Sequence, residues 1–309
     1  MPDQCELAVI GGGIAGLTAA WNAAGRGAEV ALFEESGAVG GLVANVGAID
    51  DYPAPGTLAG ATLADALLER CSAMRVALHR RRVESLTHDG ESWALRSAAG
   101  ITQARAVIVA SGARLRRLGV PGEIELAGRG VSQCDWCDGG LYRNQAVAVV
   151  GAGDAALQAA LHLATMCASV AIIARSSTLR ARRAYVERAA DNERISFMWE
   201  TAVDAINGDG AVEALTLRSL PDGHPSRYEC RGVFVFVGVE PNTDFLPADV
   251  RLDADGLILT DARGRASQPG LFAAGAVRSG YSGALTSAAG DGAAAAVAAL
   301  ADIDREPKY

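Results

Sequence analysis

The sequence has little proline, no excess of positive charge and no hydrophobic run long enough to span a membrane. Its 309 residues include 10 prolines against 36 glycines, which favours tight strand-to-helix turns over proline-rich linkers. With 28 Lys and Arg against 36 Asp and Glu, the net charge is −8. A chain this acidic lacks the basic face that nucleic acid requires, so we expect no nucleic-acid partner. Half of the residues are hydrophobic, which excludes a disordered chain and, at this length, predicts about two domains.

The best candidate for a membrane span, residues 292–301, is mostly alanine and falls short of the ~20 apolar residues required. We therefore expect no membrane association. The N-terminus shows no basic region followed by an apolar run, so we expect no signal peptide and a cytoplasmic protein. In a reducing compartment, the closely spaced Cys134 and Cys137 indicate a metal site or a redox pair rather than a structural staple.

A glycine-rich turn follows the first apolar segment. Residues 6–10 predict a buried parallel strand, and Gly11-x-Gly13-x-x-Gly16 follows before a predicted helix. In this pattern the first glycine permits the sharp turn, the second lets a pyrophosphate approach the backbone, and the third lets the helix pack on the strand. Glu34 ends the next predicted strand 23 residues after Gly11, close to the ~20 expected of a ribose-binding acid. The pattern predicts a dinucleotide site rather than a turn without a ligand.

The same strand, turn and helix pattern recurs 140 residues later, around Gly151-x-Gly153-x-x-Ala156. Alanine at the third position still permits close packing and is common in NADP-type units. The segment after the next strand has no acidic residue but carries Arg175 and Arg180, which favours a nucleotide 2′-phosphate over a free 2′-hydroxyl. The alternative is that both arginines are solvated surface residues.

The segment Cys134-Asp135-Trp136-Cys137-Asp138 is the chemical centre of the sequence. At a helix start such a pair can form a small-loop disulfide, although two inert buried thiols are an alternative. Zinc would need a second pair of Cys or His ligands, which the sequence lacks, so we expect no metal. Asp138 is either a proton donor or a charge that suits a helix N-terminus. We expect the other four cysteines to be small core residues, and His162 to be a packing or surface histidine.

With these motifs in this order, the chain resembles the low-molecular-weight thioredoxin reductases along nearly its whole length. Larger disulfide reductases keep their redox cysteines near the first motif and carry an extra dimerisation domain, and this chain has neither feature. The other matching landmarks are Gly40-Gly41, Ala110-Ser111-Gly112, Gly130-Val131-Ser132-Gln133 before Cys134, Tyr142-Arg143-Asn144, Gly238-x-x-Pro241-Asn242-Thr243 and Gly270-Leu271-Phe272-Ala273-Ala274-Gly275.

The resemblance implies an α/β homodimer with two doubly wound, Rossmann-like dinucleotide-binding domains. Residues 1–113 and 243–309 would form a discontinuous FAD domain, and residues 114–242 an inserted domain with the NADPH site and the redox disulfide. In such enzymes NADPH reduces FAD, and FAD reduces the disulfide. Cys137 would face the flavin, and Cys134 would attack a thioredoxin-like protein or a small disulfide substrate. The domains would rotate relative to each other, because nicotinamide and disulfide alternate at one flavin face.

The resemblance also carries over the remaining site residues. Asp138 would be the catalytic acid. Those implied to contact FAD are Gly11, Gly13, Ile14, Ala15, Gly16, Glu34, Gly40, Gly41, Leu42, Asn45, Asp51, Ala110, Ser111, Gly112, Gly275, Ala276, Ala284 and Leu285. Those implied to contact NADPH are Gly151, Gly153, Asp154, Ala155, Ala156, Arg175 and Arg180.

The chain departs from the family pattern at several of these positions. Leu42 replaces the usual Gln, Asp51 an Asn, and Ala276 the Asp that holds the ribityl chain, and Ser176 replaces one clustered arginine of the NADPH site. We expect FAD to bind with a shifted redox potential. Trp136 between the cysteines either shields the disulfide, narrows the range of partners or is a simple filler.

The altered pockets motivate two alternatives. The first is a flavoprotein of the same fold that uses another electron donor or acts as a dithiol oxidase. Known oxidases of this kind tend to have His after the second Cys, and Asp138 argues against that reading. The second is a degenerate nucleotide-binding protein with an interaction role. The presence of Cys134, Cys137 and Asp138 argues against it.

Overall fold

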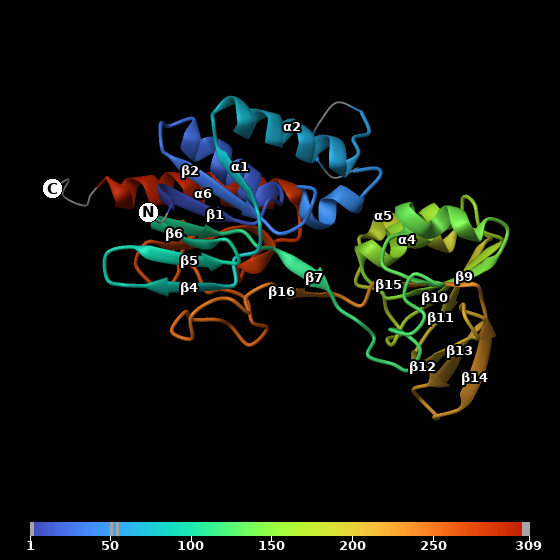
Figure 1. Cartoon of the computed structure of the whole chain (residues 1–309). Helices are drawn as coiled ribbons and strands as arrows, with labels where there is room; N and C mark the ends of the chain where they lie inside the picture. The colour runs from blue at the N-terminus through green and yellow to red at the C-terminus, as the bar shows by residue number, and fades with distance from the viewer. Residues whose placement is uncertain (1–2, 50–51, 54–55, 305–309) are drawn as a thin grey trace. The chain divides into compact units, whose positions relative to one another are not determined.

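The computed structural model of the protein describes residues 3–49, 52–53 and 56–304. The chain forms two compact units (Figure 1). Unit 1 combines the segment that ends at Arg114 with the segment that begins at Glu240, and unit 2 comprises Leu115–Val239. The chain crosses between the units at β7 (Ala113–Leu115) and β16 (Val239–Pro241), which pair with each other.

Unit 1 is built on a seven-stranded sheet with the order β3-β2-β1-β6-β5-β4, and β17 also pairs with β6. The strands β3, β2, β1, β6 and β17 are parallel, whereas β4 and β5 form an antiparallel hairpin. Strand β2 is buried along its whole length, and residues 7–10 of β1 and 106–109 of β6 are buried apolar runs, because both faces of the sheet are covered there. The elements are β1 (Asp3–Ile10), α1 (Ile14–Ala24), β2 (Val30–Glu34), η1 (Gly41–Asn45), α2 (Gly60–Ala73), β3 (Ala77–Arg80), β4 (Ser85–His88), β5 (Trp93–Ser97), β6 (Gly100–Val109), β17 (Leu271–Ala273), η3 (Gly275–Val277) and α6 (Leu285–Ile303).

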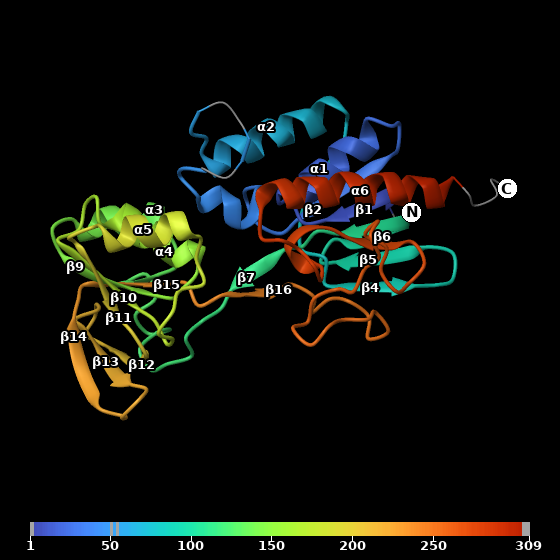
Figure 2. The same cartoon turned by 180° about the vertical axis from the view of Figure 1, so that it is seen from behind.

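Three helices, α1, α2 and α6, cover one face of this sheet (Figures 1 and 2). Alternate residues of β1 divide between the two faces, as a strand period of two requires. Leu7 and Val9 enter the core under the helices, while Ala8 and Ile10 enter a second core beneath residues 245–277. The glycine-rich turn at the end of β1 is thereby held between two packed layers.

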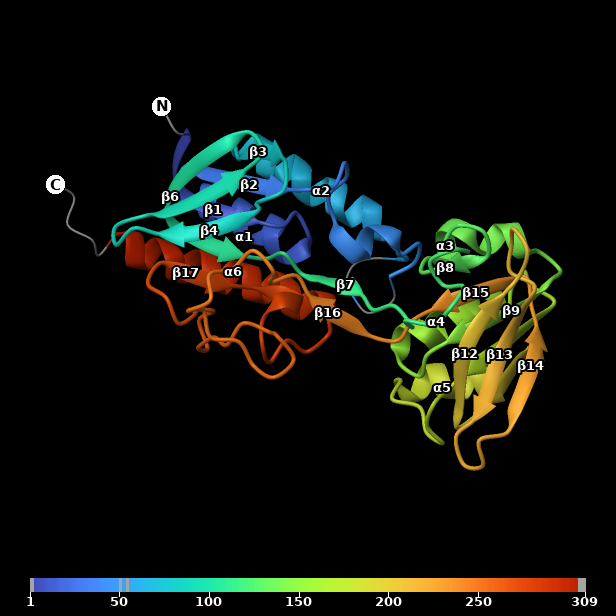
Figure 3. The ribbon, with the colours of Figure 1, turned by 60° about the horizontal axis from the view of Figure 1, so that its bottom comes forward.

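Unit 2 contains a parallel five-stranded sheet with the order β11-β10-β9-β15-β8. Helices α4 and α5 pack on one face, and the antiparallel sheet β12-β13-β14 packs on the other (Figure 3). Its elements are β8 (Val131–Ser132), α3 (Asp135–Asp138), η2 (Gly139–Tyr142), β9 (Ala146–Val150), α4 (Asp154–Leu163), β10 (Ser169–Ile173), α5 (Arg183–Ala190), β11 (Ile195–Met198), β12 (Thr201–Asn207), β13 (Ala214–Ser219), β14 (Pro225–Glu229) and β15 (Gly232–Val235).

Both units are α/β structures with parallel sheets, which confirms the predicted fold class. In each, a strand, a glycine-rich turn and a helix come in direct succession, as the two repeated motifs require. Within the described residues, no helix combines the length and the apolar character needed to cross a membrane.

Three cysteines outside the redox pair are core residues. Cys71, Cys167 and Cys230 are buried and take part in no disulfide. Burial raises the pKa of Cys71 to about 11 and that of Cys230 to about 12, and it also raises the pKa of Cys167. A thiol with so high a pKa carries almost no thiolate at neutral pH, so these three cysteines are poor nucleophiles.

Candidate active site

The first glycine-rich turn joins β1 to α1, and backbone crowding explains two of its glycines. Gly11 has a φ of +107°, and a Cβ there would stand 2.3 Å from the carbonyl oxygen of Ala110. A Cβ on Gly16 would stand 1.8 Å from the carbonyl oxygen of Gly11. Gly13 differs, because a Cβ on it would meet no atom within 4 Å. Only the middle glycine therefore leaves open space beside the start of α1, where a pyrophosphate would approach.

Glu34 fastens this turn to the end of β2. Its buried carboxylate accepts a hydrogen bond from the Gly12 amide at 2.7 Å and another from the Ser36 amide at 2.8 Å. The Ser36 hydroxyl also donates to Oε1 at 2.8 Å, so three of the carboxylate's about four lone-pair positions are used, and Oε2 keeps one for a ribose hydroxyl. Glu34 lies where the sequence places the ribose-binding acid.

The Gly40-Gly41 pair lies beside the same turn. The Gly40 amide donates to the Gly12 carbonyl at 2.7 Å, and a Cβ on Gly40 would stand 2.8 Å from the Cβ of Ala64. Leu42 follows in η1 with 41% of its surface exposed. Asn45 ends η1, and Asp51 lies outside the described residues.

The C-terminal segment meets the start of α1 from another side. A Cβ on Gly275 would stand 2.8 Å from the Cβ of Ala15, which places η3 against the first turn of α1. Ile14 and Ala15 are buried there. Ala284 is the N-cap residue of α6 and Leu285 its first residue, and no side chain caps that helix end.

Asp291 is a partly buried acid, with 18% of its side chain exposed, that the sequence reasoning missed. Its Oδ2 accepts a hydrogen bond from the Gly275 amide at 3.2 Å, and its Oδ1 pairs with the Arg278 guanidinium at 2.8 Å. Ala276, where the family pattern has an acid, lies between these two partners in the chain. A signal was present, because Asp291 is the only charged residue between positions 285 and 300.

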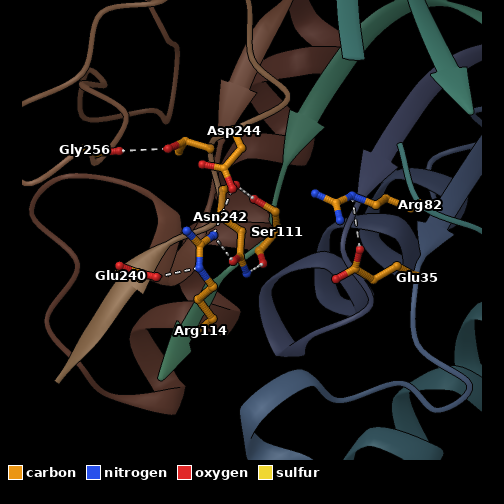
Figure 4. A network of polar contacts seen from close by, with 9 residues as sticks. Glu35, Arg82, Ser111, Arg114, Glu240, Asn242, Asp244 and Gly256 are labelled. Atoms are coloured by element: carbon orange, nitrogen blue, oxygen red, sulfur yellow. Dashed lines mark hydrogen bonds and ion pairs between the residues drawn. The ribbon is translucent and has the colours of Figure 1, made fainter. Parts of the chain in front are cut away.

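The segment Ala110–Gly112 is fastened to the returning chain of unit 1 (Figure 4). The Ser111 hydroxyl donates to the Asn242 carbonyl at 2.7 Å, and the Asn242 side-chain amide donates back to the Ser111 carbonyl at 2.9 Å. The Asn242 amide also donates to the Gly112 carbonyl at 3.0 Å. Beside them, Arg114 forms ion pairs with Glu240 at 2.6 Å and with Asp244 at 3.0 Å. These contacts join the two chain segments that make up unit 1.

The second glycine-rich turn joins β9 to α4 and repeats the geometry of the first. Gly151 has a φ of +150°. A Cβ there would stand 2.3 Å from the Phe236 carbonyl oxygen and 2.9 Å from the Cβ of Ala156. A Cβ on Gly153 would meet no atom within 4 Å. The turn therefore fits a nucleotide pyrophosphate in the same way. Ala155 is exposed in the first turn of α4.

The two predicted phosphate-binding arginines lie in the loop after β10. Arg180 is next to the second turn, because its amide donates to the Ala152 carbonyl at 2.8 Å. Arg175 and Arg180 are both exposed. Asp154 has a partner of its own, since its carboxylate accepts from the Arg182 amide at 2.7 Å and pairs with the Arg182 guanidinium at 2.8 Å. Arg182 was not singled out from the sequence.

Cys134 and Cys137 form a disulfide across the one-turn helix α3. Cys134 is the N-cap residue, and its Sγ accepts a hydrogen bond from the Cys137 amide at 3.1 Å. Cys134 is half-buried and Cys137 is exposed. An amide hydrogen bond to sulfur favours the thiolate, so Cys134 is the better placed nucleophile once the disulfide is open.

Asp138 ends α3 and is held by Ser132, a landmark of the family pattern to which the sequence reasoning gave no role. The hydroxyl of the buried Ser132 donates to Asp138 Oδ2 at 2.6 Å. The hydroxyl oxygen of Ser132 in turn accepts a hydrogen bond from the Cys134 amide at 3.0 Å. Burial and, secondly, the negative charge of Asp138 raise the pKa of Tyr142. Ser132 thus connects the acid to the backbone of the redox pair.

Unit 2 does not bring the disulfide and the second turn together. α3 contacts α4 through His162, near the C-terminal end of that helix. The Gly151–Gly153 turn feeds the N-terminal end, eight residues earlier at Asp154. At 1.5 Å per residue this is about 12 Å along the helix axis. A nucleotide pyrophosphate bound at the turn would therefore lie well away from the disulfide.

The comparisons with known proteins agree with this arrangement. Residues 5–297 match the family model described as pyridine nucleotide-disulphide oxidoreductase. The thioredoxin reductase of Treponema pallidum is 36% identical over 305 residues, which cover 98% of this chain and 99% of that protein. The bifunctional thioredoxin reductase/thioredoxin of Mycobacterium leprae is 39% identical over 94% of this chain and 64% of its own length. The crystal structure of Lactococcus lactis thioredoxin reductase superposes with a TM-score of 0.94 at 33% identity, covering 97% of this chain and 99% of that one.

The open space at Gly13 makes a test that separates cofactor binding from folding. We expect Gly13→Ala to leave the unfolding temperature of the FAD-free protein unchanged, because the new methyl meets no protein atom within 4 Å. The same methyl occupies the path of the pyrophosphate, so FAD affinity should fall at least about tenfold. Gly16→Ala, by contrast, should lower the unfolding temperature itself, because its Cβ collides with the Gly11 carbonyl. FAD titration and thermal unfolding measure both. Unchanged FAD affinity in Gly13→Ala would contradict the assignment.

Proposed function

The chain belongs to the pyridine nucleotide-disulphide oxidoreductases and, within them, to the thioredoxin reductases, and on that premise we propose that it passes electrons from NADPH through FAD to the Cys134–Cys137 disulfide and on to a thioredoxin-like protein. The observation that carries the proposal is the placement of this disulfide on α3, in the unit that holds the second glycine-rich turn but away from that turn. Passing the hydride of a nicotinamide to a disulfide calls for a two-electron carrier such as a flavin, and the first turn in unit 1 fits one.

We assign FAD to unit 1 and NADPH to unit 2. When bound, FAD takes up an electron pair from NADPH and gives it to the disulfide. Around Gly13, the open space and the uncapped first amides of α1 suit the FAD pyrophosphate, and Glu34 suits its ribose. Gly153 offers the same space to NADPH, and Arg175 and Arg180 supply positive charge for its 2′-phosphate.

The residues of α3 handle the thiols and the proton. Reduction of the disulfide yields two thiols, and the Cys137 amide favours the thiolate of Cys134, which attacks the partner's disulfide. Cys137 then attacks the mixed disulfide and releases the reduced partner. Asp138, oriented by Ser132, holds the proton that a leaving thiolate needs. The Mycobacterium leprae relative, named as a fusion of thioredoxin reductase and thioredoxin, supports a thioredoxin-like partner.

We also place the enzyme in the cytoplasm, as the sequence predicted. Cys71, Cys167 and Cys230 carry thiols that form no disulfide, which is typical of a reducing compartment.

The division of labour between the cysteines predicts the behaviour of Cys134→Ser. This variant should lose thioredoxin reduction to background, because no thiolate remains to attack the partner's disulfide. Bleaching of the flavin absorbance by NADPH should persist, since Cys134 belongs to neither glycine-rich turn. Stopped-flow absorbance and a coupled disulfide assay measure the two steps. Cys5→Ser is the matched control and should retain both. Turnover of a protein disulfide by Cys134→Ser would show that the roles are wrongly assigned.

The position of Arg180 predicts a selective effect on NADPH. Arg180→Ala should raise the KM for NADPH about tenfold, because one charge-assisted contact to the 2′-phosphate is lost. The KM for NADH should not change, since NADH lacks that phosphate. Steady-state kinetics with each nucleotide as the varied electron donor check this. Arg183→Ala, an exposed residue paired with Glu187, is the matched control. An equal loss with both nucleotides would sink the assignment of Arg180.

We further propose that the protein is a homodimer, as the family resemblance implies. The outer face of α6 supports this, because the exposed Val297 lies among Ala293, Ala294 and Ala301 in a shallow apolar pocket. Light scattering should give a mass near twice 31.7 kDa. If this face forms the contact, Val297→Arg should shift the protein towards the monomer. A wild-type monomer at micromolar concentration would refute the proposal.

A further inference from the structure

The two residues between the redox cysteines are both held by one side chain from outside α3. His162, near the end of α4, places its Nδ1 at 2.7 Å from Asp135 Oδ2. A carboxylate only accepts hydrogen bonds, so Nδ1 donates. The Trp136 indole stacks on the same imidazole, with ring centroids 3.7 Å apart and planes 16° apart. His162 thus contacts both residues inside the loop that the disulfide closes, Asp135 by a hydrogen bond and Trp136 by stacking.

The burial of this cluster makes its contacts stronger than those of a surface pair. The side chains of His162 and Asp135 are only 17% and 14% exposed. Trp136 is 46% exposed, and its stacked imidazole covers part of the ring. Hydrogen bonds gain strength where water is excluded, and aromatic stacking adds to the area buried. His162 therefore joins α3 to the rigid end of α4.

Such an attachment matters because α3 has only one turn. A four-residue helix is unstable by itself, since forming the first turn orders several residues for one hydrogen bond. While the disulfide is closed, the covalent bond holds Cys134 and Cys137 together. Once it opens, the turn keeps one backbone hydrogen bond, from the Asp138 amide to the Cys134 carbonyl at 3.1 Å, and the contacts made by its side chains. Those contacts are Asp138 with Ser132 on β8, and Asp135 and Trp136 with His162.

We propose that His162 is a positioning residue that sets the balance between the disulfide and dithiol forms of Cys134 and Cys137. By holding α3 in its turn after reduction, it keeps the two sulfurs close to each other. A thiol held near its partner has a high effective concentration, which favours the closed disulfide. Neither contact of His162 involves a sulfur atom or Asp138, so its action is on geometry. The inference rests on the redox role proposed above for the pair.

The test measures the equilibrium of the holoenzyme with glutathione. In this exchange two glutathione thiols reduce the Cys134–Cys137 bond and leave as glutathione disulfide, so their two protons and two electrons pass to the cysteine pair. Alkylation of the open thiols and mass spectrometry of the peptide that contains both cysteines give the two populations. This readout needs neither NADPH nor thioredoxin, so it can fail or succeed independently of the proposed function.

We expect His162→Ala to shift the equilibrium about tenfold towards the dithiol, which corresponds to a reduction potential about 30 mV less negative. Two partial variants divide the effect. His162→Asn keeps a donor for Asp135 without the stack, and His162→Phe keeps a stack on Trp136 without the donor, so each should fall between wild type and His162→Ala. His224→Ala, on an exposed turn of the same unit, is the matched control and should not shift the equilibrium.

A double-mutant cycle tests whether the contact itself acts. Asp135→Ala should also shift the equilibrium towards the dithiol, and adding His162→Ala should add less than its full single effect, because the shared contact is already lost. Three results would overturn the proposal: a His162→Ala equilibrium within twofold of wild type, a shift towards the disulfide, or strictly additive effects of the two substitutions. A His162→Ala protein that is less heat-stable but has an unshifted thiol–disulfide equilibrium would also overturn the proposal.

Discussion

The close packing of backbone around the first turn of α1 is the constraint on which unit 1 depends. Gly16 approaches the carbonyl of Gly11 so closely that a Cβ would stand 1.8 Å from its oxygen. From α6, Gly292 approaches the Ala15 carbonyl, where a Cβ would stand at 2.1 Å. Gly275 meets the Cβ of Ala15 from the end of β17. The strand, both helices and the C-terminal segment meet at one point because each contact carries a small residue. The same crowding fixes the amides that face the open space.

In unit 2, the same close packing of backbone positions helix α4. Gly151 and Ala156 bring α4 onto the end of β15, and this helix then serves two purposes. Its first residues complete a turn that suits a nucleotide, and its last turn carries His162 to the redox loop. This short helix thus holds the nucleotide turn and the redox loop at its opposite ends.

Local patterns accounted for the fold class and for the family, both of which are confirmed. The turns could be predicted because strand, glycines and helix are consecutive in the chain, and because glycine spacing reflects contacts between near neighbours. The departures from the family pattern were harder to interpret. Ala276 suggested a lost acid, yet the structure places the Asp291 carboxylate on the amide of Gly275 with Arg278 beside it. An acid from α6 thus lies beside this segment and is paired with Arg278.

The sequence by itself determined the fold class and the family, and it predicted which residues carry the chemistry: the glycines of both turns, the Cys134–Cys137 pair and the acid that follows it. Only the tertiary structure decided which side chains hold them in place. His162 meets Asp135 across 27 residues of chain, and Asn242 meets Ser111 across 131. Such pairs leave no periodicity or spacing in the sequence, because they depend on how helices and strands pack against one another. Residue spacing reflects contacts between residues close in the chain, whereas the packing of helices and strands decides which distant residues come into contact.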